Sequence, residues 1–462
     1  MSEEKKDTWS KEVRTIKKQD MCKGLGYQAI CGEILVDSPS GDIDKKESGK
    51  VFYTAYFSDQ IRPVIFFFNG GPGAASVWLH LGAFGPKRVD GLDVDSHQHA
   101  LVENQETLLN VADLVFVDPI GTGFSSCREG LIKEFCGEKT DASYLSQFII
   151  KFMSSYKIWD RPIYLCGESY GGYRSALINY ELITKYGLHT KGMILVAPFL
   201  SGISTEESAP NIIAEAHFLC GYIVSAWYHG RSSLSKLGQD EQSIYQKAKQ
   251  FAYQEYLPAR LKSPLYQLDS ELLEHLANMS GIDLSTLKKE GLNIQTFCAH
   301  LFPGEHRYPG RIDSRYTLQQ PVSFSPIYLD PSTVLLSQKL SPATNTYLRQ
   351  ELGWESADSY VMLSKQISEI WQYEEPFYSS AFEALRAGLK LSPRMSIYTA
   401  AGYYDLAVPL ASVEYDLLQL ADTAELAQRL RLEHFAAGHM MYVQEKSRKK
   451  LSQSIQAFIR ET

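Results

Sequence analysis

Short, continuous hydrophobic runs alternate with stretches of helical spacing through the first 200 residues. Residues 64–68 (Val-Ile-Phe-Phe-Phe) and 114–117 (Leu-Val-Phe-Val) are entirely apolar, as is typical of strands buried on both faces. Continuous apolar strands separated by helices predict a mostly parallel sheet that helices cover on both faces. Two further predicted strands and two predicted helices occupy residues 162–166, 193–197, 141–157 and 171–186.

Strand-like patterns also stand at both ends of this region. Residues 27–37 and 51–57 have the composition of antiparallel strands joined by a polar turn. Two later strand-like runs lie at 395–400 and 430–434. The late runs extend the predicted sheet after a long interruption.

The interruption predicts an inserted domain. Residues 201–335 are more polar and rich in helical patterns, and Leu-Pro, Ser-Pro and Phe-Pro pairs break them. We therefore predict an α/β core over 21–200 and 336–462, with 201–335 inserted as a helical cap. Residues 1–20 are predicted to form a polar, flexible lead-in.

Composition narrows the function classes. The 462 residues are 44% hydrophobic and 22% charged, with a net charge of −8 and no basic stripe, which argues against nucleic acid as a partner. No run of 18 apolar residues predicts a membrane span, and the N-terminus has no secretory signal. We expect a cytoplasmic protein by default and leave export by a non-classical route open. Seven cysteines without a Cys-x-x-Cys pair favour free thiols, with disulfides left open.

One hexapeptide carries the strongest chemical signal. Gly-Glu-Ser-Tyr-Gly-Gly at 167–172 contains Gly-x-Ser-x-Gly between a predicted strand and a predicted helix. A serine on such a sharp turn exposes its Oγ, and the first helical N–H groups point at the same place. The pattern alone is weak, but its context predicts Ser169 as a nucleophile.

A serine nucleophile needs a base and an acid that orients the base. Asp405 and His439 follow the serine in that order, and each lies in a loop after a late predicted strand. The other ten histidines are worse placed, and a lone loop histidine is more often structural than catalytic. His97-x-His99 could form half of a metal site, but no matching ligand cluster follows, so we predict no metal and no cofactor.

The glycine-rich loops supply the remaining parts. One oxyanion donor should be the backbone N–H of Tyr170, and the other should come from Asn-Gly-Gly-Pro-Gly at 69–73. The alternative for 69–73 is a phosphate cradle, which the absence of a following Lys-Ser/Thr disfavours. The loops at 69–73, 118–123 and 167–172 all follow strands, so they are expected to meet in one crevice.

Together these motifs identify a family. The set 69–73, Asp-Pro-Ile-Gly-Thr-Gly-Phe-Ser at 118–125, 167–172, Gly-Tyr-Tyr-Asp at 402–405 and Gly-His at 438–439 resembles the serine carboxypeptidases, with the bacterial branch as the nearest in character. The resemblance implies an α/β-hydrolase fold with an inserted helical cap. It also implies removal of the C-terminal residue from peptide substrates, favoured at acidic pH.

The resemblance further assigns binding roles. It places the substrate carboxylate on Asn69, Gly70 and Glu168, and the oxyanion on the N–H groups of Gly71 and Tyr170. A glutamate that faces a carboxylate must share a proton with it, because two close anions cannot both stay ionised. A structural hydrogen bond between Glu168 and Asn69 is the alternative role, and both roles are compatible.

The chain departs from the family pattern in three ways. Eukaryotic members often carry a second Glu where this chain has Ala83, so half of the carboxylate clamp is missing or another group supports it. Residues 74–76 read Ala-Ala-Ser instead of Cys-Ser-Ser, which removes a familiar disulfide, and a secretory signal common among relatives is absent. An esterase or acyltransferase on the same triad and a catalytically silent binding protein remain alternatives. Family analogy alone allows a homodimer.

Overall fold

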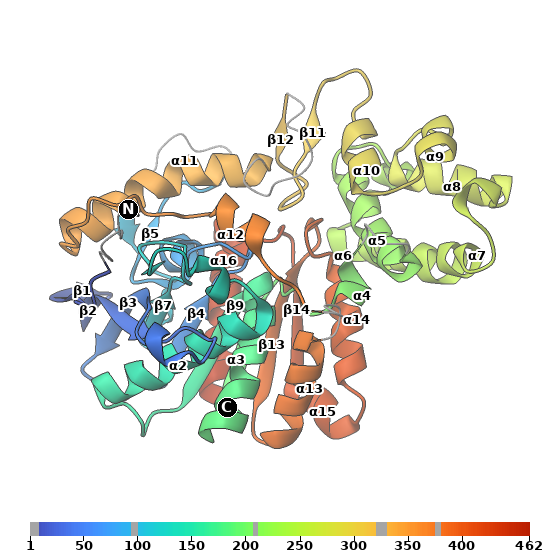
Figure 1. Cartoon of the computed structure of the whole chain (residues 1–462). Helices are drawn as coiled ribbons and strands as arrows, with labels where there is room; N and C mark the ends of the chain where they lie inside the picture. The colour runs from blue at the N-terminus through green and yellow to red at the C-terminus, as the bar shows by residue number, and fades with distance from the viewer. Residues whose placement is uncertain (1–8, 94–99, 207–210, 320–329, 375–379) are drawn as a thin grey trace, which may run out of the picture.

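A ten-stranded sheet forms the centre of the computed structural model, which describes residues 9–93, 100–206, 211–319, 330–374 and 380–462 (Figure 1). Its strands run β1-β2-β3-β7-β4-β9-β10-β13-β14, with β8 beside β3. Their bounds in that spatial order are β1 Thr15–Cys22, β2 Leu25–Val36, β3 Gly49–Ser58, β7 Asp113–Val117, β4 Val64–Phe68, β9 Ile163–Glu168, β10 Gly192–Val196, β13 Ser396–Gly402, β14 Leu430–Phe435 and β8 Ser126–Cys127.

The sheet is antiparallel at its N-terminal edge and parallel elsewhere. Strands β1, β2, β3 and β7 pair antiparallel, and every pairing from β7 through β4 to β14 is parallel. Every side chain of β4 is buried, because alternate residues enter the cores on opposite faces of the sheet. The mostly parallel sheet predicted from the apolar runs is confirmed.

Helices cover both faces. Helices α2 (Glu138–Tyr156), α3 (Tyr170–Tyr186) and α13 (Ser380–Leu391) pack side by side on one face (Figure 1). Phe152 of α2 stacks edge-on against Phe66 of β4 in that core. On the other face, α16 (Glu445–Glu461) buries Leu451 and Ile455 in the second core.

A helical lobe follows β10 and lies beside the β14 end of the sheet (Figure 1). Its long helix α5 (Ile212–Tyr228) packs on α14 (Leu410–Leu420) of the core. The other helices of the lobe are α4 Gly202–Thr205, α6 Glu241–Phe251, α7 Leu257–Arg260, α8 Ser270–Ser280, α9 Leu284–Glu290 and α10 Ile294–His300.

The chain returns from this lobe over the upper edge of the sheet. The short hairpin β11 (Tyr308–Pro309) and β12 (Thr317–Leu318) precedes α11 (Pro331–Asn345), and α12 (Lys365–Ile370) follows (Figure 1). Helix α11 extends across residue 335, the predicted end of the cap, and packs against α1 (Val77–Leu79) and β5 (Lys87–Val89). β5 pairs with β6 (Leu101–Glu103), and α15 (Ala424–Arg429) precedes β14.

The expected lead-in is partly structured. Residues 15–20 belong to β1, and all eight residues of β1 pair with β2. Six of those eight side chains are exposed, because β1 is an edge strand with polar side chains on both faces. A strand without apolar alternation leaves no signal in the hydrophobic pattern.

Hydrophobic helices and cysteine pairing are the remaining features of the fold. Within the described part of the chain, no helix has the length and hydrophobicity needed to cross a bilayer. The seven cysteines are held as thiols, and none is joined in a disulfide.

Candidate active site

Ser169 occupies the sharp turn between β9 and α3. Its backbone has φ 59° and ψ −127°, a left-handed conformation that is rare for a residue with a Cβ. A Cβ added at Gly171 would lie 2.2 Å from the carbonyl oxygen of Phe68, and one at Gly167 would lie 2.1 Å from that of Gly171. Only glycine fits at these two positions, so the sequence pattern produces the sharp turn that leaves Ser169 partly exposed.

Asp405 and His439 meet at the ends of neighbouring parallel strands. Nδ1 of His439 lies 2.6 Å from Oδ2 of Asp405. The other carboxylate oxygen of Asp405 accepts hydrogen bonds of 2.8 Å from the N–H groups of Ala407 and Val408, which fixes the carboxylate. Burial of His439 disfavours its charged form, but the adjacent carboxylate of Asp405 outweighs it and raises the pKa of the imidazole.

A small pocket of about 40 Å³ brings together most of the predicted site residues. Ser169 and His439 line it, while Asp405 lies behind His439 and is 1% exposed. The backbone N of Tyr170 adjoins the loop at 69–73, since a Cβ at Gly70 would lie 2.5 Å from it. The remaining lining residues are Asn69, Gly70, Gly71, Ala74, Trp78, Glu168, Ile312, Thr333, Leu363 and Met440.

Glu168 is a buried carboxyl group directly before the serine. Its Oε2 accepts a 3.2 Å hydrogen bond from Nδ2 of Asn69 and a 2.8 Å hydrogen bond from the hydroxyl of Tyr442. Burial raises the pKa of Glu168 to about 7, against the opposing effects of His439 and the two donors. The structural hydrogen bond expected between Glu168 and Asn69 is therefore present, and the carboxyl group titrates near neutrality.

Asn69 is fixed from three sides. Its side-chain oxygen accepts a 3.2 Å hydrogen bond from the N–H of Leu79, and its backbone carbonyl accepts one from Arg174. Arg174 also forms an ion pair with Asp141, whose Oδ2 lies 2.5 Å from Nε, and both side chains are fully buried. The loop at 69–73 is thus held by a charge pair inside the core.

The third glycine-rich loop does not line the pocket. Asp118 instead accepts hydrogen bonds of 2.8 Å and 2.6 Å from the backbone N–H and the hydroxyl of Ser76. Of the three loops expected to meet in one crevice, 69–73 and 167–172 share this pocket, whereas 118–123 is not among its lining residues. Burial raises the pKa of Asp118 to about 6. Its role is to support the segment that follows 69–73.

Residues 311–314, which follow the helical lobe, bond to the loops that contain Asp405 and His439. The N–H of His439 donates to the carbonyl of Ile312 at 2.7 Å, and the N–H of Gly438 donates to Oδ2 of Asp313 at 3.1 Å. The same segment, 311–314, bonds to Tyr404 and Leu406 on either side of Asp405. Sequence reasoning missed these contacts, because Ile312 and Asp313 lie in a region with no motif.

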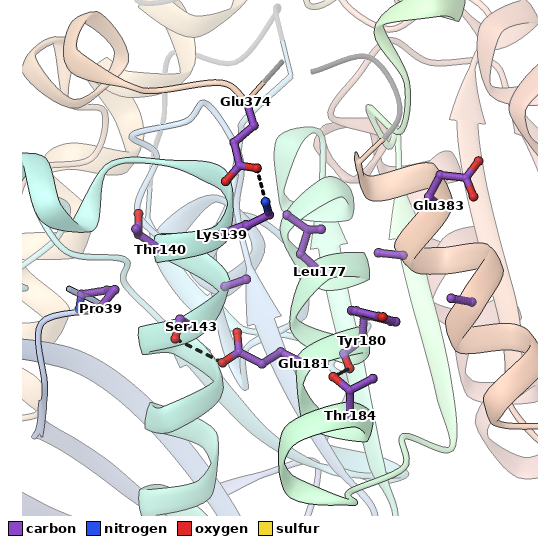
Figure 2. A pocket seen from close by; sticks show the side chains of 13 residues that line it. Pro39, Lys139, Thr140, Ser143, Leu177, Tyr180, Glu181, Thr184, Glu374 and Glu383 are labelled. Carbon is purple, nitrogen blue, oxygen red and sulfur yellow. Dashed lines mark hydrogen bonds and ion pairs between the residues drawn. The ribbon is translucent and has the colours of Figure 1, made fainter. Parts of the chain in front are cut away.

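No alternative centre with metal ligands is present among the described residues, where no group of three His, Cys, Asp or Glu side chains could hold an ion. His97 and His99 lie outside the described residues. A larger hollow of about 810 Å³ lies between α2, α3 and α13 (Figure 2). Lys139 and Glu374 pair across it, and none of the predicted site residues lines it.

Comparisons with known proteins place the chain in a family. The family model described as serine carboxypeptidase matches residues 36–452, so the chain belongs to the serine carboxypeptidase family. It is 32% identical to a carboxypeptidase Y homolog of Arthroderma benhamiae over 146 residues, or 30% of this chain and 28% of that protein. It is 30% identical to serine carboxypeptidase-like 45 of Arabidopsis thaliana over 32% of this chain and 31% of the relative.

A solved structure supports the fold. The prohormone-processing carboxypeptidase Kex1(delta)p from Saccharomyces cerevisiae aligns with a TM-score of 0.60 at 15% identity, covering 94% of this chain and 91% of that one. At that identity the likeness concerns the α/β-hydrolase fold alone. The chain matches less than a third of the length of the two curated relatives, and these are fungal and plant proteins, so the expected nearness to a bacterial branch is not supported.

Proposed function

We propose that this protein is a serine carboxypeptidase that removes the C-terminal residue of peptides through an acyl-enzyme on Ser169. The observation that carries the proposal is the buried carboxyl group of Glu168, which lines the same pocket as Ser169 and His439 and has a pKa near 7. An ester substrate brings no free carboxylate that would require such an acid. A carboxypeptidase must receive the terminal carboxylate, and no Lys or Arg is among the described residues that line this pocket. A protonated acid can receive that carboxylate without an opposing negative charge.

The proposed catalytic steps are those of a serine hydrolase, and the contact between His439 and Asp405 supports them. His439 takes the proton of the Ser169 hydroxyl as the oxygen attacks the scissile carbonyl, and Asp405 holds the imidazole with its proton on Nδ1. The N–H groups of Gly71 and Tyr170 stabilise the oxyanion. His439 then protonates the leaving amino group, and water releases the acyl group from Ser169 by the same route.

The terminal carboxylate of the substrate would lie against Glu168, Asn69 and the N–H of Gly70. One N–H of the Asn69 amide donates to Glu168, which leaves its second N–H for the substrate. Glu168 shares its proton with the incoming carboxylate, so binding requires the protonated acid. Affinity for a free carboxylate therefore falls as the pH rises through the pKa of Glu168, which gives the acidic preference.

One experiment tests the activity. Wild type and Ser169→Ala are incubated with a series of N-blocked dipeptides from pH 4 to 8, and released amino acids are quantified. We expect release by wild type only, with a loss of at least ~10⁴-fold in the variant. Release by Ser169→Ala at a comparable rate would exclude this nucleophile, and the wild-type series reports which C-terminal side chains are accepted.

Ala83 favours a second candidate, an esterase or acyltransferase on the same triad. It is fully buried and provides no second carboxyl group for a substrate terminus. Turnover of ester substrates without release of amino acids from any dipeptide would establish this alternative. If a fluorophosphonate failed to label Ser169 as well, a silent binding protein would be the remaining explanation.

A further inference from the structure

The hydroxyl of Tyr442 lies against the acid that receives the substrate in the proposed function. We propose that Tyr442 is a positioning residue that confines the proton of Glu168 to Oε1. This inference rests on the proposed function for its consequence in catalysis, but its structural part can be tested without activity.

Only one of the two carboxyl oxygens of Glu168, Oε2, accepts hydrogen bonds from the described residues. Both Tyr442 and Asn69 donate to Oε2, at 2.8 Å and 3.2 Å. Among the described residues, no further side-chain or backbone donor reaches its carboxylate. The carbonyl oxygen of a neutral acid is a better acceptor than its hydroxyl oxygen, so two donors on Oε2 favour the proton on Oε1. Because Glu168 lines the pocket, its O–H is then available to a carboxylate that enters beside Ser169.

The ring of Tyr442 packs closely against the turn at Gly82. A Cβ added at Gly82, the residue before Ala83, would lie 3.2 Å from Cε2 of the Tyr442 ring. Burial raises the pKa of the Tyr442 hydroxyl well above its ordinary value, so the phenol stays protonated across the working range. It can donate to Glu168 but cannot share a titrating proton with it, unlike a second carboxylic acid.

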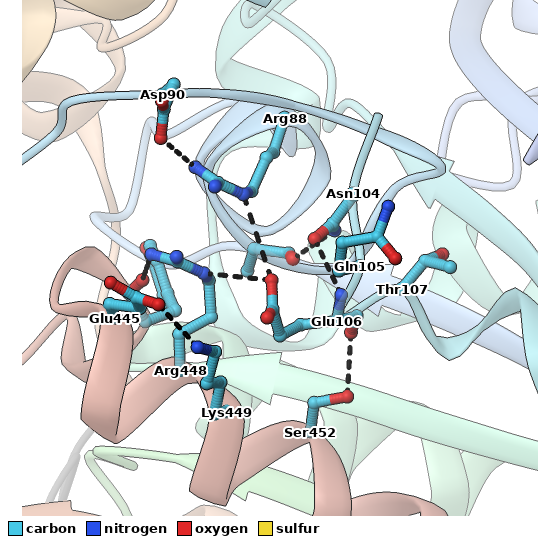
Figure 3. A network of polar contacts seen from close by, with 12 residues as sticks. Arg88, Asp90, Asn104, Gln105, Glu106, Thr107, Glu445, Arg448, Lys449 and Ser452 are labelled. Atoms are coloured by element: carbon cyan, nitrogen blue, oxygen red, sulfur yellow. Dashed lines mark hydrogen bonds and ion pairs between the residues drawn. The ribbon is translucent and has the colours of Figure 1, made fainter. Parts of the chain in front are cut away.

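Figure 3 shows a network of charged side chains that includes Arg88, Glu106 and Arg448. This network also holds the backbone of Tyr442. Arg448 donates to the carbonyls of Tyr442 and Val443 at 3.3 Å and 3.4 Å. Its Nε lies 3.4 Å from Oε2 of Glu106, and Nε of Arg88 approaches the same oxygen at 3.8 Å. One carboxylate thus lies between two guanidinium groups, and one of these orders the chain at Tyr442.

The same network reaches the turn that contains Ala83. The N–H of Glu106 donates to Oδ1 of Asn104 at 3.1 Å (Figure 3). Nδ2 of Asn104 donates to the carbonyls of Ala83 and Gly85 at 2.8 Å and 2.7 Å. The turn that contains Ala83 and the backbone of Tyr442 are therefore tied together through Glu106. This network holds Tyr442 in position beside Glu168.

The test removes only the hydroxyl. Tyr442→Phe is compared with wild type and with Tyr398→Phe, which loses a 2.7 Å hydrogen bond from another buried tyrosine to Glu433. Protein labelled with ¹³C-glutamate is titrated by infrared difference spectroscopy, and the spectrum of Glu168→Gln identifies the Glu168 band. A donor to an ionised acid lowers its pKa, so its loss should raise the Glu168 titration by about one pH unit in Tyr442→Phe only.

Kinetics then show whether this matters for catalysis. On N-blocked dipeptides, the alkaline limb of kcat/KM should move upward with the Glu168 titration in Tyr442→Phe, and KM at acidic pH should rise about 3- to 10-fold because the proton is no longer confined to Oε1. An unchanged Glu168 titration in Tyr442→Phe would overturn the inference. A shifted titration without any peptide hydrolysis by wild type would uphold the placement of the proton and reject the carboxypeptidase proposal.

Discussion

The backbone N–H of Gly438 donates a 3.1 Å hydrogen bond to Oδ2 of Asp313, which joins the loop of the predicted base to a segment 125 residues earlier in the chain. A Cβ on Gly438 would lie 2.5 Å from the Cβ of Asp313, so the two backbones meet too closely for any other residue at 438. Asp313 in turn bonds to the guanidinium of Arg315, with Nε 2.8 Å from Oδ1. The position of His439 therefore depends on a residue outside every motif.

Asp313→Ala should impair catalysis more than binding. Removing the carboxylate leaves the N–H of Gly438 and the side chain of Arg315 without this partner, so the His439 loop can shift against Ser169. We expect kcat to fall roughly 10- to 100-fold with KM little changed, since small displacements of a catalytic group cost that much. Steady-state kinetics and the rate of fluorophosphonate labelling measure the effect.

A matched control separates this effect from a general loss of stability. Asp422→Ala removes a partly exposed ion pair with Arg386 and should leave kcat unchanged. Thermal unfolding of both variants shows whether Asp313→Ala is folded at the assay temperature. Full activity in folded Asp313→Ala would mean that the bonds from Ile312 and Arg311 hold the loops without Asp313.

Asp405→Asn should inactivate the enzyme while leaving it folded. The carbonyl of the new amide is expected to face the N–H groups of Ala407 and Val408, because the amide NH₂ cannot accept their hydrogen bonds. The NH₂ group would then face Nδ1 of His439, so the imidazole proton would lie on Nε2. A protonated Nε2 cannot accept the proton of Ser169. We expect a loss of about 10⁴-fold in kcat with an unchanged melting temperature. A loss under tenfold would refute Asp405 as the orienting acid.

The sheet and the serine turn could be predicted from the sequence because burial and steric contact restrict the residue types at their positions. The run at 64–68 is apolar at every position because β4 is buried on both faces, and that pattern belongs to few structures besides a parallel strand. The glycines around Ser169 are required because a Cβ at either position would lie about 2 Å from backbone atoms. At such positions the residue type alone indicates the local structure.

Contacts between distant segments left no comparable signal. Asp313 and Tyr442 act through side chains whose partners are fixed only once the cap and the last helix are in place. β1 was missed because an exposed edge strand needs only its backbone to pair. Asp118 was placed in the crevice by its motif, but the direction of its side chain depends on packing that spacing along the chain does not encode.

The proposed role of Glu168 predicts a pH dependence that can be measured separately from the titration of His439. The ratio of kcat/KM for an N-blocked dipeptide to that for its C-terminal amide isolates carboxylate recognition, since both substrates use His439. Protonated Glu168 accepts the free carboxylate, and the ionised form repels it. The ratio should therefore be high below the pKa of Glu168 near 7 and fall as the pH rises through it.

Glu168→Gln provides the control for this ratio. The amide is neutral at every pH and retains a hydrogen-bond donor, so the ratio should become flat between pH 5 and 9 while the amide substrate keeps its wild-type profile. A ratio that still falls near pH 7 in Glu168→Gln would assign the titration to another group. A flat ratio in wild type would remove Glu168 from carboxylate recognition.

Replacement of Asp416, a buried residue away from the active site, should stabilise the protein at high pH. It is 1% exposed on α14, its Oδ2 accepts a 2.9 Å hydrogen bond from Ser204 of α4, and Oδ1 has no hydrogen-bond partner in the described part of the chain. Burial raises the pKa of this carboxyl to about 8, so the folded protein binds a proton that the unfolded chain releases above about pH 4. The contribution of Asp416 to the free energy of unfolding therefore falls between pH 4 and pH 8.

Asp416→Asn stays neutral and should be more stable than wild type by about 1–3 kcal/mol at pH 8, with little difference at pH 4. Thermal unfolding of both proteins across this range measures the effect, and a difference in melting temperature that did not grow with pH would show that Asp416 is ionised in the folded protein.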